Sequence, residues 1–141
     1  MIRLTIPGPP VGKQRPRICR SGHAFTPAKT VNYEALVKHE FAFKYPDFVP
    51  MSGPIWITLM IYVMPSKETM RKIKKGIAMK PTIKPDLDNV IKTFADALGG
   101  GLAYMNDKQI ISVIATKDYS VPPRVEVEMN ELKNSSHGRE K

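Results

Sequence analysis

A mostly apolar run, from Ile55 to Met64, constrains the fold of this chain more than any other feature. Pro54 and Pro65 bound it, and large apolar side chains occupy both of its alternating sets of positions. That pattern is typical of a strand inside a sheet that is covered on both faces. The run has about ten residues and contains Thr58, whereas a membrane-spanning helix needs roughly 20 apolar residues. We therefore exclude a membrane protein and predict that the run is the central strand of a globular domain.

Three further segments carry strand patterns. Residues 2–6 and 124–129 alternate apolar with polar side chains, which predicts two half-buried strands. Residues 109–117 are rich in β-branched side chains and predict a third strand. The inward positions of the two alternating segments are Ile2, Leu4, Ile6, Val125, Val127 and Met129.

A first helix is predicted to begin at Thr30, a plausible N-cap, and to end before Pro46. Its apolar positions predict one buried side. These positions are Val31, Ala35, Leu36, Phe41 and Phe43.

A second and more regular helix is predicted to begin at Asp86 or Asp88 and to end at the glycines 99–101. Its apolar residues follow the spacing of one helical face. A short helix is also predicted between Ser66, a possible N-cap, and Gly76. The predicted buried positions of the helix that ends at glycines 99–101 are Ile91, Phe94, Ala95 and Leu98.

The order of these elements favours an α+β fold, with a mixed sheet of about four strands and two main helices. The chain has 141 residues, which suits one domain with one core. We place that domain at residues 1–130 and expect a polar, frayed tail at residues 131–141.

The charge balance predicts an anionic partner. Lys and Arg number 22 against 13 Asp and Glu, which gives a formal net charge of +9. Nucleic acid is the usual partner of such a chain. The cations gather near the amino terminus and between residues 67 and 84, where Glu68 is the single acid. The predicted DNA-binding residues are Lys13, Arg15, Arg17, Lys67, Arg71, Lys72, Lys74, Lys75, Lys80 and Lys84.

Cysteine usage and the amino terminus bear on the cellular compartment. The one cysteine, Cys19, forms neither an internal disulfide nor a zinc cluster, and no His/Asn pattern supports it as a catalytic thiol. The first residues contain no apolar stretch behind a basic segment, so we expect no secretory signal. A reducing, cytoplasmic setting is expected.

The segment from Lys84 to Lys92 carries the residues best suited to catalysis. Pro85 favours an extended backbone before it, and Asp86 and Asp88 can then point to the same side. If the helix begins at Asp88, Lys92 follows one turn later on the same face. Two carboxylates beside a helix N-terminus, with a lysine within reach, suit a Mg²⁺ site that processes phosphate.

A third carboxylate would complete such a site, and Asp107 is the best candidate. The second helix is about 15 Å long at 1.5 Å per residue. The segment after it can return that far if it is extended, at up to about 3.3 Å per residue. Asp107 can therefore reach Asp86, just before the strand that begins at Gln109.

Each of these residues also has a structural interpretation. Asp86 or Asp88 can serve only as a helix N-cap. Lys92 can form a surface ladder with Asp88 and Asp96, and Asp107 can be a turn residue. From spacing alone, a nucleic-acid binder is favoured and metal catalysis is not established.

The same residues resemble a known family. The segments 84–98, KPDLDNVIKTFADAL, and 106–110, NDKQI, are similar to the RusA family of Holliday-junction resolvases, which are small phage- and prophage-associated endonucleases. The resemblance extends over residues 1–130. It includes the basic Pro/Gly-rich segment 7–17, Tyr33 and Glu34, the basic segment before Pro81, and Lys117 before the last strand.

The resemblance implies a Mg²⁺-dependent endodeoxyribonuclease of DNA recombination and repair, with Mn²⁺ a possible substitute. It implies Asp86, Asp88 and Asp107 as metal ligands and Lys92 as the catalytic lysine. It also implies a homodimer that nicks two symmetric strands of a four-way junction and leaves 5′-phosphate and 3′-hydroxyl ends. Some relatives carry two acids where this chain has Asn106 and Asp107.

Two other functions compete with this one. The first is a non-catalytic basic protein that binds junctions or duplex DNA, in which the carboxylates are structural. The second is a nuclease that acts on flaps or other branched DNA.

Overall fold

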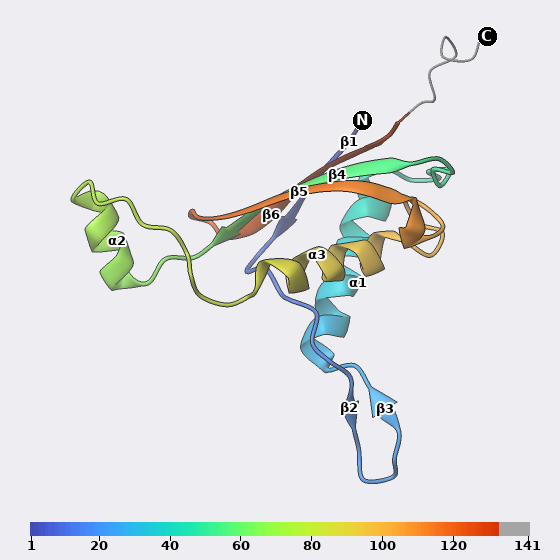
Figure 1. The fold of residues 1–141 in the computed structure, drawn as a ribbon, viewed down its shortest axis with the longest axis horizontal. Helices are drawn as coiled ribbons and strands as arrows, with labels where there is room; N and C mark the ends of the chain where they lie inside the picture. The colour runs from blue at the N-terminus through green and yellow to red at the C-terminus, as the bar shows by residue number, and fades with distance from the viewer. Residues whose placement is uncertain (133–141) are drawn as a thin grey trace.

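A four-stranded mixed sheet forms the centre of the fold, in the strand order β1-β6-β4-β5 (Figure 1). The computed structural model describes residues 1–132. Strand β6 pairs antiparallel with both β1 and β4, and β4 pairs parallel with β5. The strands are β1 (Ile2–Pro7), β4 (Ile55–Val63), β5 (Ile110–Tyr119) and β6 (Arg124–Glu131). The expected α+β class and mixed four-stranded sheet are confirmed.

Strand β4 lies inside the sheet, as its apolar sequence predicts, but only one of its faces is fully buried. Every second residue from Ile55 to Val63 is buried in the core, and the residues between them are half-buried. Both long helices lie on the core side (Figure 1). The half-buried apolar residues on the other side include Trp56, Met60 and Tyr62.

Helix α1 (Ala28–Lys44) begins earlier than predicted and buries a different side. Pro27 occupies the N-cap position, and Thr30 is a buried residue of the first turn. The buried side is formed by Tyr33, Val37 and Phe41, which are spaced four residues apart. The predicted positions at Val31 and Phe43 are wrong, since these side chains are 48% and 80% exposed. Ala35 is exposed as well, and Leu36 is half-buried. Apolar residues occur on both sides of this helix, so periodicity alone does not choose between them.

Helix α3 (Leu87–Leu98) begins and ends as predicted, with Asp86 at the N-cap position and Gly99 at the C-cap. Its buried side is rotated by about one residue from the predicted one, because Ile91 and Ala95 are only half-buried. The hydroxyl of Thr93 donates to the carbonyl of Val11, so the chain from the amino terminus packs on this side. The buried residues are Val90, Thr93, Phe94, Ala97 and Leu98.

Two projections extend from the body (Figure 1). The first contains α2 (Lys67–Lys74), which has no buried residue; Ser66 caps it and Gly76 follows with a positive φ of 87°, as predicted. The second is a hairpin of β2 (Arg17–Ile18) and β3 (Ala24–Phe25), which was not predicted. Two-residue strands are too short to produce a periodic pattern in the sequence.

The carboxyl-terminal strand continues into the segment expected to be a tail. Glu131 belongs to β6, and the amide of Leu132 donates to the carbonyl of Pro54. The remainder of the predicted tail, residues 133–141, lies outside the described residues. None of the helices in residues 1–132 has the length and hydropathy needed to cross a bilayer.

Candidate functional site

The start of helix α3 presents two carboxylates to solvent. Asp86 has an extended backbone and makes no side-chain capping bond, and Asp88 accepts only the amide of the adjacent Asn89, at 3.0 Å. Neither side chain therefore caps the helix in the way that the structural interpretation required. Among residues 1–132, no salt bridge involves Asp86, Asp88, Lys92 or Asp107. The surface ladder through Lys92 is therefore not formed, and these carboxylates are free to bind a cation.

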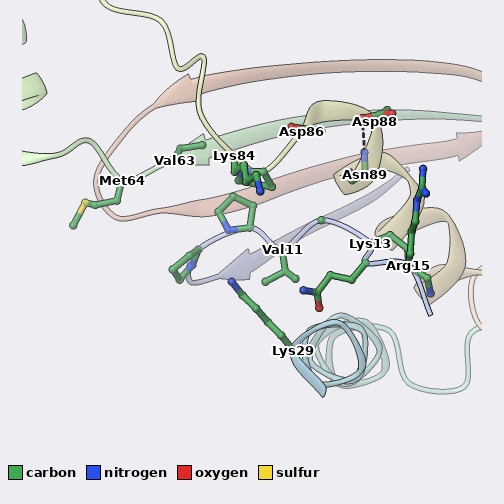
Figure 2. Close-up of a pocket in the computed structure, with 15 residues that line it drawn as sticks. Val11, Lys13, Arg15, Lys29, Val63, Met64, Lys84, Asp86, Asp88 and Asn89 are labelled. Carbon is green, nitrogen blue, oxygen red and sulfur yellow. Dashed lines mark hydrogen bonds between the residues drawn. The ribbon is translucent and has the colours of Figure 1, made fainter. Parts of the chain in front are cut away.

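Asp86 and Asp88 line a hollow of about 750 Å³ (Figure 2). Four parts of the chain surround it: the segment 9–15, the first turn of α1, the end of β4 and the start of α3. Arg15, Lys29 and Lys84 bring positive charge to the same hollow as the two acids. A polyanion approaching the carboxylates thus meets cations around them.

Strand β5 holds the segment that leads into Asp86. The ammonium of Lys117 donates to the carbonyls of Ile83 and Pro85, at 2.6 and 2.9 Å. These contacts tie the residues before α3 to the sheet. The position of Asp86 is thus set by a strand more than thirty residues away in sequence.

Asp107 begins a 3-10 turn, η1 (Asp107–Gln109), immediately before β5. Asn106 is the N-cap of this turn, with its side chain bonded to the amide of Lys108 and its own amide bonded to Gln109. Asn106 therefore has a structural function in this chain. Asp107 is exposed and lines a smaller hollow of about 220 Å³ together with Asp96.

The three predicted metal ligands are not gathered into one group. Within residues 1–132, no group of three or more His, Cys, Asp or Glu side chains is arranged to hold one metal ion. Asp86 and Asp88 share the larger hollow, whereas Asp107 lies beside the second half of α3. Lys92 is exposed on α3, one turn after Asp88 and one turn before Asp96.

The tight turn after α3 accounts for this position of Asp107. Gly100 and Gly101 have positive φ angles of 71° and 102°, and Gly101 donates its amide to the carbonyl of Tyr104. The buried Tyr104 in turn donates its hydroxyl to the carbonyl of Ala95, at 2.6 Å. The chain therefore folds back on the end of α3 and does not extend along the helix.

The predicted DNA-binding cations fall into different environments. Lys13 also lines the larger hollow, but its ammonium is bound to two carboxylates, Glu34 at 2.7 Å and Asp96 at 3.1 Å. Burial opposes its charge, but the hydrogen bonds to these carboxylates and their negative charges together outweigh burial, so the pKa of Lys13 is raised. Lys80 pairs with Asp118 at 2.8 Å. The others lie on the hollow (Arg15, Lys84), on β2 (Arg17), or on and just after α2 (Lys67, Arg71, Lys72, Lys74 and Lys75).

Two lysines that help to build the site were not among the predicted site residues. Lys29 borders the hollow from the first turn of α1, and no pattern in the sequence distinguishes it from other surface lysines. Lys117 was noted only as part of the resemblance. The β-branched residues of 109–117 predicted a strand that ends at Lys117, and the contact of Lys117 with the loop before α3 depends on the pairing of strands β4 and β5.

Two comparisons with known proteins bear on the family of this chain. A family model described as endodeoxyribonuclease RusA matches residues 7–130. The chain is also 35% identical over 140 residues to a protein of Bacillus subtilis (strain 168) named "Uncharacterized protein YqaN". That match covers 93% of this chain and 96% of the Bacillus protein.

Proposed function

This chain belongs to the RusA family of endodeoxyribonucleases, and on that premise we propose that it resolves four-way DNA junctions in a reaction that depends on Mg²⁺. One observation carries the proposal. The carboxylates of Asp86 and Asp88 lie at the start of a helix without capping it, and neither forms a salt bridge among residues 1–132. They line a hollow that is also lined by Arg15, Lys29 and Lys84. Oxygen ligands beside cations suit a hard divalent ion and a phosphodiester together.

Asp86 and Asp88 would hold the metal, with Asp107 as the proposed third ligand and Mn²⁺ as a possible substitute. When bound, the ion lowers the pKa of a coordinated water and offsets negative charge on the phosphate. Lys92 is the proposed catalytic lysine. Its free ammonium would hold a non-bridging phosphate oxygen or orient the attacking water.

The two projections support branched DNA as the substrate. The hollow lies at the base of both, because Arg15 leads into the hairpin, while Met64 and Lys84 are at the two ends of the segment that contains α2. DNA at the hollow would thus have cationic surface on two sides. Contacts of this kind hold phosphates without reading bases.

The proposed active form is a homodimer, with one site for each of two symmetric strands. This proposal rests on the resemblance to the family and on the match between two-fold protein symmetry and a two-fold junction. Cleavage would leave 5′-phosphate and 3′-hydroxyl ends. The soluble, cytoplasmic setting expected from the sequence is part of the same proposal.

A non-catalytic DNA-binding protein is the second candidate. The separation of Asp107 from Asp86 and Asp88 favours it, because two carboxylates form a weaker metal site than three. A nuclease for flaps or other branched DNA is a variant of the main proposal. A cleavage assay that compares flaps, forks and four-way junctions distinguishes this variant from a junction resolvase.

The deciding experiment compares the wild type with Asp88→Asn on a synthetic four-way junction with fixed arms. We expect paired, symmetric nicks by the wild type in Mg²⁺ and none in EDTA. Asp88→Asn should lose cleavage and keep, or slightly increase, junction binding, because it removes an acid that repels phosphate.

Asp47→Asn is the matched control, because Asp47 is an exposed aspartate outside the hollow. It should cleave like the wild type. Tight junction binding without nicks by the wild type, in either Mg²⁺ or Mn²⁺, would contradict the enzyme and support the binding protein.

A further inference from the structure

The segment 11–14 lies between helices α1 and α3 and is bonded to both. The amide of Lys13 donates to the carbonyl of Asn89 at 2.8 Å, and Thr93 donates to the carbonyl of Val11 at 3.0 Å. On the other side, the hydroxyl of Thr30 in α1 accepts from the backbone amide of Gln14 and donates to the side-chain oxygen of Gln14. The segment therefore joins the two helices.

Contact between this segment and α3 is close enough to require glycine. A Cβ atom added at Gly12 would lie 2.9 Å from the Cβ of Asn89, which is below any normal contact. The backbone at Gly12 thus packs directly on the first turns of α3. These are the turns that carry Asp88 and follow Asp86.

The side chain of Lys13 completes the connection with two ion pairs. Glu34 belongs to α1 and Asp96 to α3, and both bond to the same ammonium. The Lys13 side chain is only 21% exposed, so water screens these pairs less than it screens surface pairs. Without Lys13, two partly buried carboxylates would face each other with no counter-charge.

The chain continues from this segment directly into the β2–β3 hairpin. The strands of the hairpin pack chiefly on each other, so the orientation of the hairpin depends on the residues at its base. Arg17 is exposed there, and the apolar Ile18 and Phe25 are 75% and 48% exposed. The hairpin thus presents cationic and apolar side chains to a partner from a base fixed at residues 11–14.

We propose that Lys13 is a positioning residue: its ammonium joins Glu34 to Asp96, and thereby fixes the β2–β3 hairpin relative to the carboxylates at the start of α3. On this proposal Lys13 does not contact phosphate, in contrast to the expectation from sequence. The effect of Lys13 on DNA binding rests on the proposed function, but the effect of Lys13 on the hairpin does not.

A spin label on Cys19 tests the proposal without DNA. Cys19 is the only cysteine in the chain and is exposed in the hairpin, so it gives one labelling site. Lys13→Met should increase the mobility of the label and raise amide exchange in residues 11–14 by about tenfold. Lys38→Met removes an exposed lysine of α1 and should change neither.

Junction binding in EDTA gives the second measurement, because no cleavage interferes. Lys13→Met should weaken binding while the slope of log affinity against log salt stays the same. A lost phosphate contact would instead reduce that slope by about 0.9. The effects of Lys13→Met and Glu34→Gln should be strongly non-additive, since both break one network.

A reduced slope together with an unchanged label would overturn the proposal in favour of a direct phosphate contact. An unchanged label with an unchanged slope would also overturn it. If Lys13→Met does not fold, Glu34→Gln replaces it, because this variant breaks only one of the two ion pairs. The spin label on Cys19 must then be more mobile in Glu34→Gln than in the wild type. If the wild type binds no junction, the proposed function fails, while the label still decides the role of Lys13.

Discussion

Single residues of the same type have opposite roles in this protein because their partners differ. Lys13 is held by two carboxylates, whereas Lys92 has no salt bridge among residues 1–132. Tyr33 and Tyr104 form a similar pair: both are buried, and burial raises the pKa of each hydroxyl above its usual value. Tyr104 donates to the carbonyl of Ala95, but Tyr33 has no hydrogen-bond partner in the described part of the chain.

This contrast predicts opposite results from the same substitution. Tyr33→Phe removes an unsatisfied buried hydroxyl and should leave the free energy of unfolding unchanged or raise it by about 1 kcal/mol. Tyr104→Phe removes a hydrogen bond and leaves the Ala95 carbonyl without that donor, so it should lower the free energy of unfolding by about 1 kcal/mol. Urea denaturation of both variants measures the difference. Equal losses would show that the Tyr33 hydroxyl has a partner after all, such as a water molecule.

At the level of elements, α3 and the turn that follows it determine where the acids lie. The helix carries Asp88, Lys92 and Asp96 at four-residue spacing, and η1 adds Asp107 beside Asp96. Asp96 shares the ammonium of Lys13 with Glu34, whereas Asp107 forms no salt bridge among residues 1–132. Asp88 lines the larger hollow and Asp96 the smaller one, and the exposed Lys92 lies between them on the same face of α3.

Asp107 and Asp96 should therefore respond differently to loss of charge. If Asp107 is a metal ligand, Asp107→Asn should lower junction cleavage by at least about 100-fold. Mutation of a residue that only hydrogen-bonds to a metal ligand lowers activity by about 100-fold at most. Asp96→Asn should cost less, since its carboxylate is already paired with Lys13. Single-turnover cleavage over a range of Mg²⁺ concentrations measures both. A smaller loss for Asp107→Asn than for Asp96→Asn would remove Asp107 from the proposed metal site.

For the whole molecule, the distribution of charge matters more than its sum. The net charge of +9 is concentrated on two projections and on the hollow between their bases. Helix α2 has no buried residue, so packing against the rest of the fold contributes little to its stability. Its N-terminus is capped by the side chain of Ser66. On the proposed function, the cations of this helix would contact DNA phosphates.

Cations on α2 should therefore affect salt dependence more than stability. Arg71→Gln with Lys74→Gln should reduce the salt slope of junction binding by up to about 1.8, or 0.9 for each lost phosphate contact. The melting temperature should hardly change. Arg3→Gln with Lys38→Gln removes the same charge from β1 and α1, outside the hollow and the projections, and should leave the slope unchanged. Equal slopes for all three proteins would mean that α2 does not bind DNA.

Features that depend only on neighbouring residues could be predicted from the sequence. Alternation at Ile2, Leu4 and Ile6 marks β1, and the Ser66 and Gly76 signals bound α2, because period and capping act within a few residues. The motif around Asp86 and Asp88 likewise indicated the family and the start of α3. Local chemistry alone sufficed for these features.

The buried side of each helix and the pairing of distant charged groups could not be predicted in this way. Val31 and Phe43 are apolar yet exposed, because the position of α1 against β1 and α3 selects the side with Val37. The pairing of Lys13 with Asp96 joins residues far apart in sequence, as does the contact of Lys117 with the loop before Asp86. Such contacts depend on how distant elements pack, and an individual side chain carries no signal of its distant partner. Position along the chain therefore suggested Lys13 as a DNA contact, whereas packing bound its ammonium to two carboxylates.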